Sequence, residues 1–188
     1  MYWYNKYSGE TSWVEPSNAK ARVAIIVPFR DLHAEQQRAA HLKTFVAHMS
    51  GYLSAAFVPF KIFIIEQSDD GRKFNRGKLL NVGYDLARQE GFDTFIFHDV
   101  DLLPSLNLVQ AYRTTPRGSS PVHIAKVWKR YTDNPSYIGG IVSFSASQFE
   151  RINGFPNNFW GWGGEDDEMM LRIREVGRGL SRAAGGLP

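Results

Sequence analysis

The chain has 188 residues, of which 43% are hydrophobic and 14% aromatic, a composition that fits one globular domain with a sizeable core and excludes a disordered chain. Its net charge of +3 comes from scattered lysines and arginines without a long basic run. We therefore expect no nucleic-acid partner, whereas an anionic ligand such as a nucleotide diphosphate is compatible with this charge. There is no cysteine, which excludes disulfides and thiolate metal sites.

Residues 1–16 are aromatic and turn-rich, unlike the rest of the chain. Tyr2-Trp3-Tyr4-Asn5 and Thr11-Ser12-Trp13-Val14 alternate as strands, and Ser8-Gly9-Glu10 between them is typical of a turn. We therefore expect a small N-terminal β-hairpin. From Arg22 onward the pattern changes to strands that alternate with helices.

The apolar run over residues 23–27 is short and continuous, as in a strand buried on both faces of a parallel sheet, and we expect Pro28 to end it. The spacing of apolar residues predicts a helix over residues 34–53. Its inward side is expected to carry Leu42, Phe45, Val46, Met49 and Leu53.

A second buried strand is predicted over residues 60–65. It is followed by a second helix over residues 75–89, which Gly91 ends. The residues expected on the inward side of this helix include Leu79, Val82 and Leu86.

The third predicted strand covers residues 94–97, and a fourth covers residues 137–144. A capping box follows, with Ser145 at the cap of a short helix and Gln148 three residues later. The last helix is predicted over residues 165–176, with Met169, Met170, Ile173 and Val176 inward. Strands and helices in this order predict an α/β domain with a mostly parallel sheet flanked by helices.

Two carboxylates, Asp99 and Asp101, directly follow the third predicted strand. Ligands of open α/β sheets bind beyond the carboxyl ends of the strands, and residues spaced by one on an extended chain can face the same way. Such a pair can hold a hard divalent cation, magnesium or manganese, which would bridge to phosphate oxygens. The alternative is an Asp that caps a turn before Leu102-Leu103-Pro104, and the sequence by itself leaves both open.

Two further motifs stand at element ends. Phe29-Arg30-Asp31 follows the first strand, where Arg30 can pair with a phosphate, or Asp31 can simply cap the next helix. Phe74-Asn75-Arg76 opens the second helix, where free N–H groups and Arg76 favour an anion, although Asn75 also serves as a structural cap.

A glycine-rich aromatic loop and four acidic residues stand together near the end of the chain. Trp160-Gly161-Trp162-Gly163-Gly164 can move and still present flat rings, on which the C–H face of a sugar stacks. Glu165-Asp166-Asp167-Glu168 suits the first turn of a helix, but four adjacent acids exceed what the helix dipole needs. We interpret one of the first three acids as a general base beside a sugar hydroxyl.

Taken in order, these motifs resemble the β-1,4-galactosyltransferase family. The similarity covers residues 22–177 and rests on Val27-Pro28-Phe29-Arg30-Asp31, Phe74-Asn75-Arg76, Leu80-Asn81-Val82-Gly83, and the segments 97–104 and 153–168. The resemblance implies a nucleotide-sugar glycosyltransferase fold of the GT-A type, with the catalytic domain over residues 22–182. It also implies a metal-dependent, inverting transfer of galactose from UDP-galactose to a hydroxyl of a terminal sugar, N-acetylglucosamine or xylose, in β-1,4 linkage.

The resemblance further implies roles for individual residues. Asp101 would bind manganese (Mn²⁺), and Asp166 would be the general base. The UDP-galactose site would be lined by Pro28, Phe29, Arg30, Phe74, Arg76, Asp99, Val100, Lys126, Tyr137 and, as the ring of a lid, Trp162. The sugars would contact Gly163, Gly164, Glu165 and Asp167.

Three departures from the family pattern bear on activity. Leu32 stands where the family motif has a second basic residue. The Met and His that complete the family's manganese site come from a segment after the last helix, and the sequence to Pro188 has no such His. Residues that select the acceptor also come largely from that segment. We therefore expect a C-terminally truncated domain with an incomplete metal site, and the alternative function is non-catalytic binding of a sugar or nucleotide.

Residues 1–16 carry a second resemblance, to the last two strands of a WW domain. Alternation puts Tyr2 and Tyr4 on one face, where with Trp13 they would form a groove for a proline-rich peptide. The other interpretation is an aromatic hairpin packed on the catalytic domain. The family resemblance suggests the Golgi lumen, although the sequence shows no signal peptide or membrane span.

Overall fold

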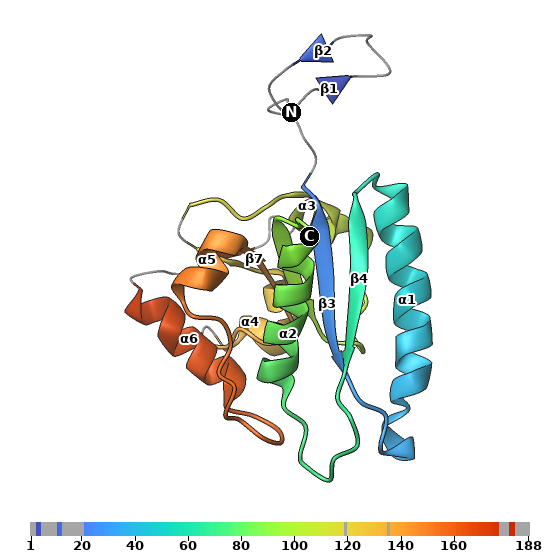
Figure 1. The fold of residues 1–188 in the computed structure, drawn as a ribbon, viewed down its shortest axis with the longest axis vertical. Helices are drawn as coiled ribbons and strands as arrows, with labels where there is room; N and C mark the ends of the chain where they lie inside the picture. Colours follow the sequence, from blue (N-terminus) through green and yellow to red (C-terminus); the bar gives the residue numbers. More distant parts are fainter. Residues whose placement is uncertain are drawn as a thin grey trace.

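The computed structural model describes residues 21–118, 120–134 and 136–176, together with the backbone of residues 3–4, 11–12 and 181–182. Its main feature is a six-stranded sheet with helices on both faces (Figure 1). In spatial order the strands are β4 (Phe60–Glu66), β3 (Val23–Phe29), β5 (Thr94–His98), β7 (Ile141–Ser145), β6 (Val122–His123) and β8 (Ser181–Arg182). The predicted α/β fold is confirmed.

The sheet is mixed. β3 runs parallel to both β4 and β5, and β6 runs parallel to β8, whereas β7 is antiparallel to its neighbours β5 and β6. Because β3, β4 and β5 are parallel, their carboxyl ends lie on the same side of the sheet. Ligands of such sheets bind beyond these carboxyl ends.

Helices cover the two faces of this sheet. One face packs against α1 (Arg38–Ala55) and α3 (Val109–Arg113), and the other packs against α2 (Arg76–Gln89), α5 (Ala146–Arg151) and α6 (Glu165–Glu175). The shorter pieces are α4 (Lys129–Thr132) and the 3-10 helices η1 (Ala34–Gln36), η2 (Leu106–Leu108) and η3 (Ile124–Val127). The predicted capping box of α5 is present, with Ser145 and Gln148 bonded reciprocally.

β3 is buried on both faces, as predicted, and its alternate residues serve two cores. Val23, Ile25 and Val27 belong to the core under α1, and Ala24 and Ile26 belong to the core under α2. All five are fully buried. β3 therefore contributes side chains to the cores on both faces of the sheet.

Three strand predictions were wrong in detail. Pro28 does not end the first strand, because β3 continues to Phe29 beyond the last pairing with β5, where proline has no ladder partner to lose on that side. β4 lies at the sheet edge, so Phe63 is its one buried residue. β7 begins only at Ile141, because Gly140 has a φ of +86°, which no strand accommodates.

Three residues expected on inward helix faces are exposed instead. Val46, Val82 and Leu86 are 38–45% exposed. The reason is clearest in α2, where Gly83 sits so close to β3 that a Cβ would collide with Ile26. This contact turns the helix so that it buries Leu79, Leu80, Gly83, Tyr84 and Ala87.

The N-terminal hairpin is confirmed at the level of the backbone. β1 (Trp3–Tyr4) and β2 (Thr11–Ser12) pair antiparallel. The side chains of Tyr2, Tyr4 and Trp13 lie outside the described residues, so the peptide groove stays a prediction. Within the described part of the chain, no helix combines the length and apolar character needed to cross a membrane.

Candidate functional site

A cavity of about 420 Å³ lies at the carboxyl ends of β3 and β5 and is closed by the first residues of α1, α2 and α6. It collects residues from segments that are far apart in the sequence. The lining consists of Pro28, Phe29, Arg30, Leu32, His33, Gln36, Arg38, Lys73, Phe74, Arg76, Asp99, Val100, Asp101, Tyr137, Gly161, Trp162, Glu165 and Asp166.

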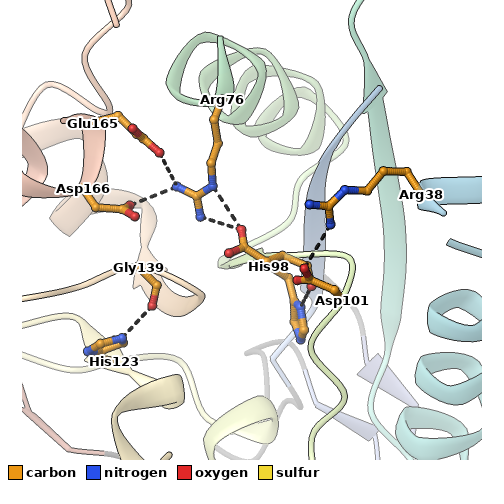
Figure 2. A network of polar contacts seen from close by, with 9 residues as sticks. Arg38, Arg76, His98, Asp101, His123, Gly139, Glu165 and Asp166 are labelled. Atoms are coloured by element: carbon orange, nitrogen blue, oxygen red, sulfur yellow. Dashed lines mark hydrogen bonds and ion pairs between the residues drawn. The ribbon is translucent and has the colours of Figure 1, made fainter. Parts of the chain in front are cut away.

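Arg76 is the centre of the polar network in this cavity (Figure 2). It is the first residue of α2, directly after the capping residue Asn75. Its Nε and Nη2 donate to Asp99 Oδ1 at 3.0 and 2.8 Å, and its Nη1 donates to Asp166 Oδ1 at 2.9 Å. Glu165 Oε1 lies 3.7 Å from the same Nη1. One guanidinium, 12% exposed, therefore joins the end of β5 to the start of α6.

The charges of this network are mutually dependent. Burial opposes the charge on Arg76, but attraction to Asp166, Asp99 and Glu165 holds the pKa of the guanidinium above its usual value. Burial raises the pKa of Asp99, and Arg76 offsets part of that rise. Burial, and then repulsion by Asp166, raises the pKa of Glu165. Arg76 is thus the countercharge that lets three neighbouring carboxyl groups share one site.

Gly139 makes room for the Asp166 carboxylate. A Cβ at this position would collide with Asp166 Oδ2 and with the Tyr137 hydroxyl, so both groups lie against the glycine. Burial, and then the charge on Asp166, raises the pKa of Tyr137. The Gly139 carbonyl accepts a hydrogen bond from His123 Nε2 at 2.8 Å (Figure 2), which fixes the backbone here.

Asp101 has a different partner from Asp99. Its Oδ2 accepts a hydrogen bond from Arg38 Nη1 at 3.0 Å, so a guanidinium stands where a metal cation could bind. The described residues contain no group of three or more side chains that could hold a metal. The Asp101 carboxylate is a ligand of the kind that magnesium and manganese prefer, and Asp101 would hold such an ion.

Arg30 also lines the cavity. Its Nη1 donates to the Arg72 carbonyl at 2.8 Å, and its guanidinium lies 5.6 Å from the centre of the Phe74 ring. The motif after the first strand and the motif that opens the second helix therefore lie next to each other in space.

Two asparagines tie the segment before the tryptophan loop to α2. Asn75 Nδ2 donates to the Asn157 carbonyl at 2.7 Å. The Asn81 amide donates to the Phe155 carbonyl at 2.8 Å and accepts from the Phe155 N–H at 2.9 Å. This paired contact holds the chain next to the first turns of α2.

The tryptophan loop itself is held by fewer bonds. Gly161 N–H donates to the Phe74 carbonyl at 2.8 Å. Trp162 lines the cavity but is 100% exposed. Gly164 caps α6 with a φ of +93°, and a Cβ there would collide with the Phe159 ring. Glycine at 164 is therefore required for the turn that brings Glu165 and Asp166 to the cavity.

Four predicted site residues do not line the cavity: Lys126, Gly163, Gly164 and Asp167. Lys126 is buried, and its Nζ donates to the carbonyls of Tyr131 at 2.8 Å and Asn134 at 2.7 Å. An ammonium used in this way supports the turn around α4. Contact of these four residues with a donor or acceptor stays a prediction.

Arg38 and Gly139 are functional candidates that the sequence did not reveal. Arg38 is one of many scattered basic residues, and nothing in its neighbourhood marks it. Gly139 is followed by Gly140, and both lie within the strand predicted over residues 137–144. A glycine pair within a predicted strand is nevertheless a signal of a close approach by another group.

A buried histidine lies directly behind the acidic turn. His98 Nδ1 lies 2.9 Å from the Asp99 carbonyl, and its Nε2 lies 2.8 Å from the Tyr112 hydroxyl. Because a carbonyl only accepts, Nδ1 carries the hydrogen and Nε2 accepts from Tyr112. Burial lowers the pKa of His98 to about 4, so the ring is neutral and serves to position the Asp99 backbone.

Two family models match this chain. One is described as the N-terminal region of glycosyl transferase group 7 and matches residues 5–114, and the other is described as the N-terminal domain of galactosyltransferase and matches residues 119–187.

Curated relatives are β-1,4-galactosyltransferases. β-1,4-Galactosyltransferase 3 of Cricetulus griseus is 40% identical over 168 residues, which are 87% of this chain and 40% of that protein. β-1,4-Galactosyltransferase 4 of Homo sapiens is 40% identical over 177 residues, which are 89% of this chain and 47% of that protein. The chain thus spans less than half the length of these relatives.

Solved structures give the same answer for the fold. The catalytic domain of Drosophila β-1,4-galactosyltransferase 7 in complex with xylobiose has a TM-score of 0.77 and is 37% identical, covering 87% of this chain and 65% of that chain. A variant of that enzyme in complex with manganese, UDP-Gal and xylobiose has a TM-score of 0.76 and is 36% identical, with the same coverage.

Proposed function

This chain belongs to the galactosyltransferase family, and from this premise we propose that it is a metal-dependent β-1,4-galactosyltransferase. It moves galactose from UDP-galactose to a hydroxyl of a terminal sugar of the xylose or N-acetylglucosamine type, with inversion at the anomeric carbon. The Drosophila relative that holds manganese, UDP-Gal and xylobiose supports this donor, this metal and an acceptor of the xylose type.

The observation that carries the proposal is the placement of Asp166. Arg76 holds its Oδ1 at 2.9 Å, and its Oδ2 lies beside the Tyr137 hydroxyl at a position that Gly139 keeps open. The carboxylate lines the same cavity as the acidic turn after β5. A base fixed in this way, near a group that can hold a diphosphate, is what a sugar hydroxyl needs for attack.

The reaction then runs as a single displacement. The acceptor hydroxyl oxygen attacks the anomeric carbon of galactose, and its proton passes to Asp166 Oδ2. The bond between that carbon and the diphosphate oxygen breaks, and UDP leaves with the electron pair. General-base assistance of this kind contributes roughly 10²–10⁴-fold to the rate.

Asp101 would hold the manganese ion. When bound, the ion neutralises the charge that builds on the departing diphosphate. Arg30 adds a second positive charge to the cavity lining, where its guanidinium lies near the Phe74 ring.

Each of the remaining lining residues would contact one part of the donor, either the nucleoside or the sugar. Pro28, Phe29 and Phe74 would offer apolar surface to the nucleoside, and Asp99 and Val100 line the same cavity. Tyr137 and Glu165 face the galactose, and Trp162 covers it as a lid. Arg76 lines the same cavity and donates three N–H groups to Asp99 and Asp166, so it positions these carboxylates, and its contact with UDP stays a prediction.

A second candidate is non-catalytic binding of a nucleotide or sugar. Two observations favour it: Asp101 is paired with Arg38, and the described residues contain no group of three or more side chains that could hold a metal ion. A pure binder would retain affinity for UDP without turnover.

Calorimetry of UDP-galactose with and without manganese, together with a transfer assay onto xylosides and N-acetylglucosaminides, tests the proposal. We expect metal-dependent donor binding and turnover in the wild-type protein. Asp166→Asn should keep donor binding and lose at least about 100-fold in turnover. The matched control Glu168→Gln removes a neighbouring charge of α6 outside the cavity and should retain turnover. Donor binding that ignores manganese, or an Asp166→Asn variant as active as the control, would refute the proposal.

Two further predictions concern the whole protein. As a glycan-modifying enzyme of this family, it would act in the Golgi lumen. The family match begins at residue 5, so it takes in most of the hairpin that resembles a WW domain. Recognition of a proline-rich peptide by that hairpin stays a prediction from the sequence.

A further inference from the structure

Arg38 carries a positive charge to the Asp101 end of the cavity. It is the first residue of α1, and its Nη1 donates to Asp101 Oδ2 (Figure 2). The side chains are 32% and 43% exposed. An ion pair this open to water is weak, because the solvent screens the attraction and both side chains lose freedom when they pair. The contact is therefore one that a competing ion can replace.

Arg76 and Arg30 are the other two arginines in the described lining of the cavity. Their hydrogen-bond partners are groups other than Asp101, so a metal ion at Asp101 would not displace them. Arg76 is bonded to Asp99 and Asp166, with 12% of its side chain exposed. Arg30 donates to a backbone carbonyl. Arg38 differs, because its short contact is to the carboxylate that would take the cation, and its contact with Gln36 is long at 3.5 Å.

We propose that Arg38 is an exchanging phosphate-binding residue. While Asp101 holds no cation, Arg38 neutralises it. When the cation takes Asp101, Arg38 turns to the diphosphate of the donor. This inference rests on the proposed function, since it requires a cation and a diphosphate in this cavity.

Geometry and charge support the exchange. Phosphate oxygens that share a cation with Asp101 would lie close to this carboxylate, and Arg38 Nη1 already lies 3.0 Å from Asp101 Oδ2. The planar guanidinium binds phosphate oxygens with two parallel N–H groups as readily as it binds a carboxylate. Arg38 therefore keeps an anionic partner in both states, and no backbone movement of α1 is required.

Two binding measurements on Arg38→Gln test this exchange. Manganese alone, titrated into nucleotide-free protein and followed by the electron paramagnetic resonance of free Mn²⁺, should bind about 2–5-fold tighter than to wild type, because a competing charge is gone. UDP, titrated calorimetrically at saturating manganese, should bind about 5–20-fold weaker, because one charge-assisted contact is lost. The control Lys43→Gln removes an exposed positive charge from the same helix and should change neither affinity. Arg38→Lys, which keeps the charge, should return manganese affinity to the wild-type value.

The two opposite shifts must occur together. Suppose that wild type binds UDP in the presence of manganese but Arg38→Gln behaves like Lys43→Gln in either titration. This result would overturn the exchange and leave the proposed function standing. Wild-type protein that binds no UDP in the presence of manganese would refute the proposed function and this inference with it.

Discussion

Replacing Arg76 with Gln removes the positive charge that three carboxyl groups share. The guanidinium makes hydrogen bonds of 2.8 and 3.0 Å to Asp99 and of 2.9 Å to Asp166, and Glu165 lies 3.7 Å away. With 12% of the side chain exposed, the loss resembles the breaking of a buried pair, which costs about 3–5 kcal/mol because the partners stay behind uncompensated. For a chain of this size we expect the melting temperature to fall by roughly 6–20 °C.

The cost of Arg76→Gln should depend on pH. The pKa values of Asp99 and Glu165 are raised even with Arg76 in place. A carboxyl whose pKa rises on folding favours the folded state when it is protonated. That contribution is fully present below the unfolded pKa and is lost as pH rises through the folded pKa. Without the countercharge both pKa values rise further, so the deficit in stability should be largest at pH 8 and shrink toward pH 5.

Urea unfolding of wild type and Arg76→Gln at pH 5, 6.5 and 8, followed by tryptophan fluorescence, measures this deficit. The control is Lys61→Gln, which breaks a 2.7 Å pair with Glu90 in which the side chains are 50% and 45% exposed. That pair should be worth at most about 1 kcal/mol. A deficit for Arg76→Gln no larger than that of Lys61→Gln, or one equal at pH 5 and pH 8, would refute the reasoning.

Three further predictions follow from close contacts and burial. Gly139→Ala should push the Asp166 carboxylate and the Tyr137 hydroxyl aside and lower turnover by roughly 100-fold, with a far smaller change in melting temperature; unchanged turnover would show that the base does not depend on this contact. Gly83→Ala forces a Cβ into a β3 side chain and should cost about 1–3 kcal/mol in urea unfolding, whereas wild-type stability would mean that α2 can shift outward. The pKa of His98 is lowered by burial to about 4, so its neutral ring stabilises the fold above the unfolded value of about 6.5 and loses this contribution as pH falls toward 4, by up to roughly 3 kcal/mol. Stability curves of wild type and His98→Asn that run parallel between pH 6.5 and 4 would contradict this.

Much of the fold was predictable because strongly apolar segments leave few alternatives. Because residues 23–27 are continuously apolar, they form a stable strand only when packed helices cover both of its faces. The acidic turn at Asp99 and Asp101 directly follows another apolar strand in the sequence, so it lies at the end of that strand. The inward face of α2 was not predictable. It depends on how closely Gly83 approaches Ile26, and this is a property of two elements together.

In the candidate site, too, some contacts could be predicted from the sequence and others could not. Phe29, Phe74 and Asp166 could be assigned to one cavity because each stands at or near the end of an element and belongs to a recognisable motif. The pairing of Asp101 with Arg38 could not be assigned in this way, because 63 residues separate the partners and a scattered arginine carries no local signal. Lys126 shows the reverse: the family resemblance implies a donor contact for it, and in the structure its ammonium donates to backbone carbonyls.

The asparagine contacts between α2 and the segment before the tryptophan loop limit how far, and how fast, that loop can move. The chain is anchored as far as Asn157 by Asn75, and Asp166 is anchored by Arg76. Residues 158–165 lie between these anchors, and a backbone hydrogen bond from Gly161 to Phe74 ties them to the segment before α2. If Trp162 acts as the proposed lid, its closure over a sugar would be a short-loop motion on the nanosecond-to-microsecond timescale, and the carboxylate of Asp166 would stay in place.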